Sequence, residues 1–199
     1  MASQKSSGKK KSQSGQLRIV AGKWRSRLLQ IADVPGLRPS SERVRETLFN
    51  WLAPRIHGSK CLDLCAGTGA LGLEALSRGA SLTVFVETSL VATKALESNI
   101  ASLNASGVEI INADARSYLQ AGHSERFDIV FLDPPFRAAM LDDLCRLLSR
   151  HGWLAEGARI YLEMDRKQVE PVLPGHWQVL KNKTAGNVRY MLAAQGAHG

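Results

Sequence analysis

Residues 61–76, CLDLCAGTGALGLEAL, decide the fold of this chain. The apolar start of the stretch predicts a buried β-strand, and Gly67, Gly69 and Gly72 follow it with the spacing G-x-G-x-x-G. The residues after the loop, 70–77, predict a helix. A strand, a glycine-rich turn and a helix in this order are typical of the nucleoside-binding loop of a doubly wound α/β sheet.

A carboxylate at the end of the next apolar stretch supports a nucleoside ligand. Glu87 stands 20 residues after Gly67, where an acid accepts hydrogen bonds from ribose hydroxyls. This arrangement serves NAD and S-adenosylmethionine equally well, so other residues must choose between them.

Two further acids favour S-adenosylmethionine. Asp63 lies in the strand just before the glycine loop, where a carboxylate suits an ammonium and a sulfonium and repels a pyrophosphate. Asp114 follows the third apolar strand. It is either a reader of the adenine amino group or the N-cap of the next helix, and the sequence leaves both open.

The motif Asp133-Pro134-Pro135-Phe136 follows the apolar strand FDIVFL and indicates the chemistry. The two prolines fix a backbone in which the aspartate and a carbonyl face the pocket, and the aromatic ring offers a surface for stacking a base. An exocyclic amino group is a poor nucleophile until acceptors hold its N–H groups. The motif therefore predicts methyl transfer to a base amine, with no metal and no covalent enzyme intermediate.

The rest of the chain completes a sheet of the same class. From Lys60 onward short apolar strands alternate with expected helices at about 70–77, 89–103, 115–119 and 138–149, as in a parallel sheet buried on both faces. The end, 176–194, reads instead as an antiparallel hairpin. We expect a methyltransferase domain at 56–199, preceded by a small hairpin and helix at 17–55 and a disordered basic tail at 1–16.

The positive charge is concentrated near the N-terminus. The net charge is +8, of which residues 1–16 carry +4 and residues 17–60 carry +6, while the rest carries −2. Such asymmetry indicates a basic region that meets a polyanion. The candidate RNA-binding residues are Arg18, Lys23, Trp24, Arg25, Arg27, Arg43 and Arg45.

These residues also have explanations that do not involve binding a polyanion. The lysine tail serves solubility equally well, and Trp24 serves as a hydrophobic anchor equally well. Arg43 and Arg45 belong to an expected helix capped by Ser40 or Ser41, so they are either a solvated helix face or part of a lid over the cofactor.

Size and composition narrow the class of protein. A chain of 199 residues is short for a two-domain dehydrogenase. Three cysteines without C-x-x-C spacing favour reduced thiols and a cytoplasmic location. No apolar run reaches the length of a membrane span, and we expect no secretory signal because no apolar stretch follows the N-terminal lysines.

Four segments together resemble the bacterial RsmD family, whose members methylate N2 of one guanine in 16S ribosomal RNA. They are RIVAGKWRSRLL (18–29), GLRPSSERVRETLFNWL (36–52), CLDLCAGTGALGLEALSRGA (61–80) and VFLDPPF (130–136). The resemblance covers about 17–192. DPPF alone is shared with adenine-N6 DNA methyltransferases, whereas the N-terminal arginine motif is more specific.

The resemblance implies a class I methyltransferase sheet, S-adenosylmethionine as cofactor, and the small ribosomal subunit or its assembly intermediate as partner. It implies no metal, and we expect a monomer. The family's RPT-like segment appears as Arg38-Pro39-Ser40, with Ser replacing Thr. The candidate cofactor-binding residues are Arg38, Ser40, Asp63, Ala66, Gly67, Gly69, Glu87, Thr88, Asp114, Ala115 and Asp133.

Two other functions remain open from the sequence. One is an adenine-N6 methyltransferase acting on DNA or RNA through the same DPPF pocket, although the chain leaves no obvious room for a duplex-recognition region. The other is a catalytically idle RNA-binding assembly factor, which the intact acidic and glycine positions disfavour.

Overall fold

The structure is a computed structural model that describes residues 15–34, 39–135 and 139–196. Most of the predicted disordered tail lies outside the described residues. The expected tail boundary is late by one residue, because Gln16 already belongs to the first strand.

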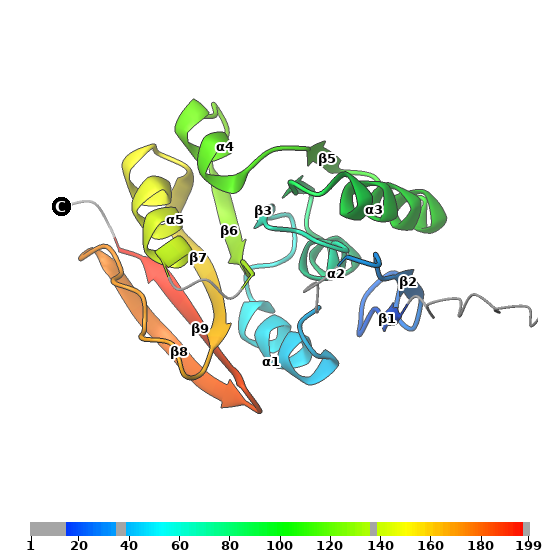
Figure 1. Ribbon diagram of the computed structural model, residues 1–199, viewed down its shortest axis with the longest axis horizontal. Helices are drawn as coiled ribbons and strands as arrows, with labels where there is room; N and C mark the ends of the chain where they lie inside the picture. Colours follow the sequence, from blue (N-terminus) through cyan, green and yellow to red (C-terminus); the bar gives the residue numbers. More distant parts are fainter. Residues whose placement is uncertain (1–14, 35–38, 136–138, 197–199) are drawn as a thin grey trace, which may run out of the picture.

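The core is one mixed sheet of seven strands with the order β5-β4-β3-β6-β7-β9-β8 (Figure 1). Neighbours from β5 to β7 run parallel, and β9 runs antiparallel to both β7 and β8. This confirms the predicted class I methyltransferase sheet closed by a C-terminal hairpin. The strands are β3 (Lys60–Leu64), β4 (Leu82–Val86), β5 (Val108–Ile111), β6 (Phe127–Leu132), β7 (Leu154–Asp165), β8 (Trp177–Ala185) and β9 (Val188–Gln195).

Helices cover both faces of the sheet (Figure 1). One face is packed by α4 and α5 around Leu62, Val130 and Leu148, and the other by α1 around Cys61, Phe131 and neighbouring apolar side chains. The α4 and α5 bounds lie within two residues of the expected ones. The helices are α1 (Glu42–Leu52), α2 (Ala70–Ser77), α3 (Leu90–Leu103), α4 (Ala115–Ala121) and α5 (Ala139–Arg150).

The N-terminal hairpin, β1 (Gln16–Arg18) and β2 (Leu28–Gln30), packs against the body through apolar side chains. Leu17 pairs with Leu29, and both belong to a buried cluster with Leu73 of α2 and Leu96 of α3. The division of the chain at 55/56 stays a proposal.

The glycine loop requires glycine for two physical reasons. Gly67 and Gly69 have φ angles of +55° and +77°, a left-handed region that L side chains rarely adopt. Gly72 lies where α2 crosses the sheet, and a Cβ there would come within 2.2 Å of Cε1 of Phe85. The loop therefore turns tightly, and the helix lies close on β4.

Within the described residues, no helix combines the length and apolar character needed to cross a membrane.

Candidate active site

A cavity of about 660 Å³ opens at the carboxyl ends of β3, β4 and β6, beside the glycine loop. This is the edge where a parallel α/β sheet binds its ligand, and the volume lies within the roughly 300–1,000 Å³ typical of ligand pockets. Eleven predicted site residues line it: Ser40, Asp63, Ala66, Gly67, Glu87, Thr88, Asp114, Ala115, Asp133, Pro134 and Pro135.

Of the described residues predicted for the cofactor and the chemistry, Gly69 alone is not among the lining residues. Gly69 instead starts α2 in a left-handed conformation, which is a structural role. Arg38 and Phe136 lie outside the described residues, so their predicted roles stay predictions.

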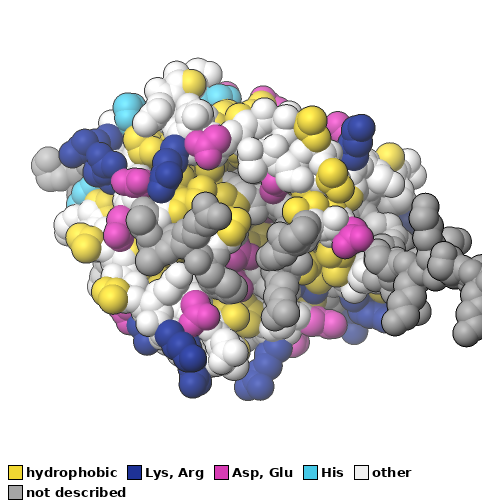
Figure 2. All heavy atoms as spheres, viewed as in Figure 1, with side chains coloured by type: hydrophobic (Ala, Val, Ile, Leu, Met, Phe, Trp, Pro, Cys, Tyr) yellow, Lys and Arg dark blue, Asp and Glu magenta, His cyan; other side chains and the backbone are white. Residues whose placement is uncertain are grey.

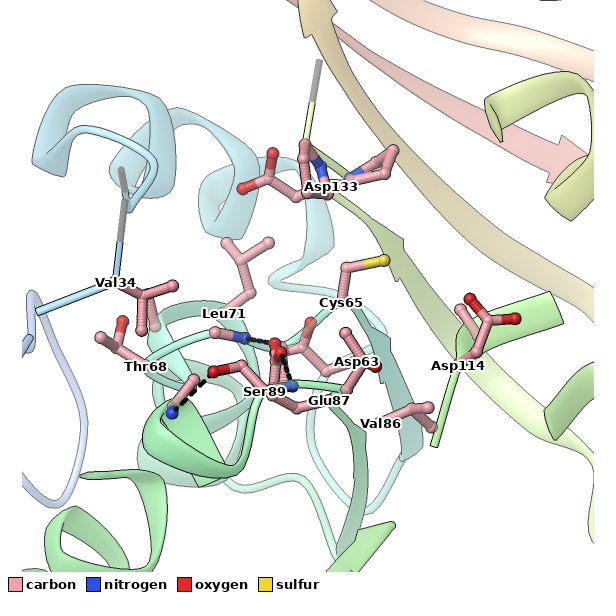
Figure 3. A pocket seen from close by; sticks show the side chains of 18 of the residues that line it. Val34, Asp63, Cys65, Thr68, Leu71, Val86, Glu87, Ser89, Asp114 and Asp133 are labelled. Carbon is pink, nitrogen blue, oxygen red and sulfur yellow. Dashed lines mark hydrogen bonds between the residues drawn. The ribbon is translucent and has the colours of Figure 1, made fainter. Parts of the chain in front are cut away.

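Two acids beside the glycine loop accept hydrogen bonds from backbone amides, and Figure 3 shows those of Glu87. Oε2 of Glu87 accepts the N–H of Gly67 at 2.7 Å, and Oε1 accepts the N–H of Ser89 at 2.7 Å. Oδ2 of Asp63 accepts the N–H of Gly72 at 2.9 Å. Carboxylates thus occupy amides that a pyrophosphate would need, which argues against a dinucleotide at this loop.

Asp63 is buried, and burial raises the pKa of its carboxyl to about 7, with the nearby Glu87 adding to the increase and the amide of Gly72 opposing it. A buried carboxylate held only by an amide gains most from a cation, since the attraction is strong where water is excluded.

Of the two roles that the sequence left open for Asp114, the structure shows the N-cap, and the adenine contact stays a prediction. Its Oδ1 accepts the N–H of Ser117 at 3.0 Å, so it is the N-cap of α4. Its side chain also lines the cavity, on a different side from Asp133 (Figure 3). The cap fixes the carboxylate in place without removing it from the cavity.

The lining residues fit S-adenosylmethionine better than NAD. Among the described residues of the cavity wall, four carboxylates, those of Asp63, Glu87, Asp114 and Asp133, face a single guanidinium, that of Arg116. Such a surface suits a ligand with an ammonium, a sulfonium and ribose hydroxyls, and it repels phosphates. The described part of the chain holds no group of three side chains suited to a metal ion.

Asp133 lies directly after β6 and lines the cavity together with Pro134 and Pro135. Burial and the neighbouring Glu163 raise the pKa of Asp133 well above its ordinary value, although a hydrogen bond from Ser40 opposes them. The proline-stiffened corner therefore presents its acid to the same crevice as the glycine loop.

Ser40 and Ser41 have separate roles. Ser41 is the N-cap of α1, since its Oγ accepts the N–H of Val44 at 3.3 Å. Ser40 is buried and contacts two acids, Oδ2 of Asp133 at 3.0 Å and Oε2 of Glu163 at 2.6 Å. Ser40 is therefore not the cap of α1, and its predicted contact with the cofactor stays a prediction, since it lines the cavity and also contacts Asp133 of the DPPF motif.

The prediction that Arg45 and Trp24 contact RNA is wrong, because both side chains are buried. The guanidinium of Arg45 is 1% exposed and pairs with Glu74 at 3.3 Å. Trp24 is 7% exposed and packs in the cluster beneath the hairpin. Arg45 is therefore a structural ion-pair residue, and Trp24 is the hydrophobic anchor that the sequence allowed as an alternative.

The remaining basic candidates are exposed: Arg18, Lys23, Arg25, Arg27 and Arg43. On the face shown in Figure 2, Lys and Arg side chains lie mainly toward the edges, and acidic side chains also lie nearer the centre. Arg27 already makes one hydrogen bond within the protein, since its Nη2 donates to the carbonyl of Ser102 at 2.8 Å.

Sequence reasoning missed several lining residues of the cavity, among them Ser89, and it also missed Glu163, which lies behind Asp133. Ser89 caps α3 and shares Glu87 with the glycine loop, and its position two residues after that acid is the available signal. Glu163 is 4% exposed and contacts Ser40 behind Asp133. A single acid inside the apolar strand ARIYLEM marks it in the sequence.

Known proteins resemble the chain over nearly its whole length. The sequence profile of the family described as Conserved hypothetical protein 95 matches residues 17–194. Ribosomal RNA small subunit methyltransferase D of Escherichia coli strain K12 is 46% identical over 186 residues, covering 94% of this chain and 93% of the relative. The protein of the same name from Haemophilus influenzae is 44% identical, covering 89% and 93%.

Solved structures agree with the sequence relatives. The E. coli protein yhhF superimposes with a TM-score of 0.85 at 44% identity, covering 92% of this chain and all of the other. The H. influenzae protein HI0767 gives a TM-score of 0.80 at 40% identity, covering 92% of this chain and all of the other. A profile match over most of the chain, relatives above 40% identity and a shared fold agree, and the chain therefore belongs to the RsmD family of methyltransferases.

Proposed function

We propose that this protein transfers a methyl group from S-adenosylmethionine to the exocyclic N2 of one guanine in 16S ribosomal RNA. One observation carries the proposal: Asp133 of the DPPF motif lines the same cavity as the acids of the glycine loop. The relatives named as ribosomal RNA small subunit methyltransferases support the substrate class.

The cofactor would be held by acids at three places in the cavity. Asp63 suits the ammonium of its amino-acid end, Glu87 suits the ribose hydroxyls, and Asp114 suits the adenine amino group. When bound, this group supplies an electrophilic methyl on a sulfonium.

Asp133 would prepare the nucleophile. The guanine N2 lone pair is delocalised into the ring, so an acceptor that holds one N–H directs the lone pair toward the methyl group. Transfer then forms the N–C bond as the S–C bond breaks, and Asp133 accepts the proton that the nitrogen loses. Pro134 and Pro135 keep this corner rigid, and Phe136 is the proposed stacking surface for the base.

The RNA would approach over exposed basic residues of the N-terminal part. Arg25, Arg27 and Arg43 are solvent-accessible and suit phosphate contacts, which position an RNA without reading its sequence. The proposed partner is the small subunit or its assembly intermediate, met by a monomer in the cytoplasm.

Labelled methyl transfer to small subunits that lack the modification tests the proposal. We expect label in N2-methylguanine, with none for the Asp133→Ala protein. Label recovered only as N6-methyladenine would select the adenine methyltransferase, and RNA binding without any transfer would select an idle assembly factor.

A further inference from the structure

Behind the catalytic motif, four side chains form a continuous chain of hydrogen bonds. Oη of Tyr161 lies 2.6 Å from Oε2 of Glu163. Oγ of Ser40 lies 2.6 Å from the same Oε2 and 3.0 Å from Oδ2 of Asp133. The hydroxyl of Ser40 therefore links a buried glutamate to the acid that lines the substrate cavity.

The sheet and helix α1 place these groups together. β6 and β7 pair in parallel with Phe131 beside Tyr161 and Leu132 beside Leu162, so the next residues in register are Asp133 and Glu163. The side chains of Tyr161, Glu163 and Ser40 are 0%, 4% and 3% exposed. These three groups have little access to water and must find hydrogen-bond partners within the protein, whereas Asp133 also borders the cavity.

The number of hydrogens does not match two ionised acids. Three contacts need three hydrogens, and the hydroxyls of Tyr161 and Ser40 supply only two. The third must be a carboxyl proton. It lies either on Glu163, which then donates to Ser40 while Ser40 donates to Asp133, or on Asp133, which then donates to Ser40.

The surrounding groups also favour one retained proton. Burial raises the pKa of Glu163, and hydrogen bonds from Ser40 and Tyr161 oppose it only in part. Burial, Glu163 and Asp63 raise the pKa of Asp133. From β9, Tyr190 is the cross-strand neighbour of Glu163 and brings only a phenol. The described groups that act on this pair are acids and hydroxyls, so one shared proton relieves their repulsion.

We propose that Asp133 and Glu163 hold one proton between them through Ser40, and that Glu163 is a positioning residue that carries this proton whenever Asp133 accepts from the substrate amine as an ionised carboxylate. The inference rests on the proposed function for its catalytic consequence. During transfer the amine nitrogen forms its bond to the methyl carbon and loses a proton to Asp133. Glu163 keeps its own proton throughout, and Asp133 releases the new proton to water after the product leaves.

The proton itself is tested without RNA. Carbon-13 NMR of labelled aspartate and glutamate carboxyls, followed against pH, should show Asp133 and Glu163 titrating as a coupled pair that retains one proton at neutral pH. Asp133 should titrate in a single step in Glu163→Gln. Both carboxyls ionised at neutral pH would overturn the inference, whatever the enzyme methylates.

The catalytic consequence is tested by the pH profile of kcat. Tyr161 and Ser40 both contact Oε2 of Glu163, and one amide group cannot accept from the first and donate to the second at that position. With its amide nitrogen there, Glu163→Gln keeps the donation to Ser40 and loses the hydrogen bond from Tyr161, so kcat at the optimum should stay within about tenfold of wild type. Its acidic limb should persist, since Asp133 still titrates. Its basic limb should move to higher pH, since residue 163 then has no proton to release.

Two further variants separate positioning from a structural role. Tyr161→Phe removes a donor to ionised Glu163 and should shift the basic limb upward. Glu163→Leu cannot donate to Ser40, and its kcat should fall by about tenfold or more even if the protein folds. Glu170→Gln, an exposed acid paired with Arg189, is the matched control with an unchanged profile.

A folded Glu163→Gln protein that binds cofactor but falls about a hundredfold in kcat would show that the ionised glutamate is needed, and would overturn the inference. Unchanged basic limbs in both Glu163→Gln and Tyr161→Phe would reduce the cluster to a structural link between α1 and β7. If neither the wild type nor any variant methylates guanine, the proposed function fails. The NMR titration still shows whether Asp133 and Glu163 retain one proton at neutral pH.

Discussion

Arg45 of α1 and Glu74 of α2 form a buried ion pair, with Nη1 3.3 Å from Oε2 and side-chain exposures of 1% and 0%. Nη2 of Arg45 also donates to the carbonyl of Arg18 at 2.8 Å. Glu74 accepts the N–H groups of Val20 and Ala21 at 2.8 Å and 3.0 Å. One carboxylate thus joins α1, α2 and the segment after β1.

Removing the guanidinium should destabilise the fold. Breaking a buried pair typically costs about 3–5 kcal/mol, and because Arg78 still pairs with Glu74 we expect about 3 kcal/mol for Arg45→Met. Denaturant unfolding measures it. Arg43→Met, on the exposed face of the same helix, should change the free energy of unfolding by less than about 0.5 kcal/mol. Equal effects would contradict the structural role of Arg45.

Cofactor affinity should depend on pH through Asp63. Its pKa is about 7 in the ligand-free protein, and a bound ammonium or sulfonium favours the ionised form. The affinity for S-adenosylmethionine should therefore rise with pH up to about neutral and then level off. Calorimetric titrations at several pH values measure it, and Asp63→Asn should bind more weakly with no rise.

Asp63→Asn should stabilise the folded, ligand-free protein above neutral pH. The folded-state pKa of Asp63 exceeds its ordinary value of 3.8, so the folded state binds more protons and its stability falls as pH rises from about 4 to 7. Asn retains an acceptor for the amide of Gly72 without the buried charge. We expect the free energy of unfolding at pH 8 to rise by about 1–3 kcal/mol. A decrease would mean that the ionised carboxylate of Asp63 does not destabilise the folded protein.

Asp133→Ala should separate catalysis from cofactor binding. We expect turnover to fall by about a thousandfold or more, because the amine has no acceptor, while the dissociation constant for S-adenosylmethionine changes by less than about threefold. Single-turnover kinetics and calorimetry measure the two effects. Asp128→Ala, at the opposite end of β6, is the control, and wild-type rates for Asp133→Ala would remove this residue from the mechanism.

RNA binding should become less sensitive to salt when exposed arginines are neutralised. Removing one contact to a phosphate lowers the slope of log K against log salt by about one or less, so the combined change of Arg25, Arg27 and Arg43 to Gln should lower it by about two to three. Filter binding across a salt series measures the slope. A slope like that of wild type would assign these residues to solubility.

Gly72→Ala should disturb the packing of α2 on β4. The new Cβ would lie 2.2 Å and 2.7 Å from two ring atoms of Phe85 and 2.8 Å from Cγ2 of Thr83. Overpacking costs about 1–3 kcal/mol, and the better helix propensity of alanine returns up to about 1 kcal/mol. Thermal unfolding should show a net destabilisation, whereas Gly175→Ala, in open space, should be neutral.

The sequence predicted the sheet and the cavity because both depend on local patterns. Buried parallel strands are continuously apolar, and the glycine spacing and the DPPF corner lie at strand ends that meet at one edge. Such patterns do not show which group neutralises a buried charge: Arg45 stands at the helical spacing of the buried Leu48 and Leu52, and its partner Glu74 is 29 residues away. Glu163 was missed because only the register of β6 and β7 brings it beside Asp133.

The three-way role of Glu74 has a consequence for how the molecule is made. Synthesis proceeds from the N-terminus, so the segment that carries Val20 and Ala21 is complete long before the carboxylate that binds their amides has been added. Its apolar residues also await partners from α2 and α3. The first-made part of the chain therefore settles only after α2 and α3 have been made, and a nascent chain that ends before Glu74 would leave it without these partners.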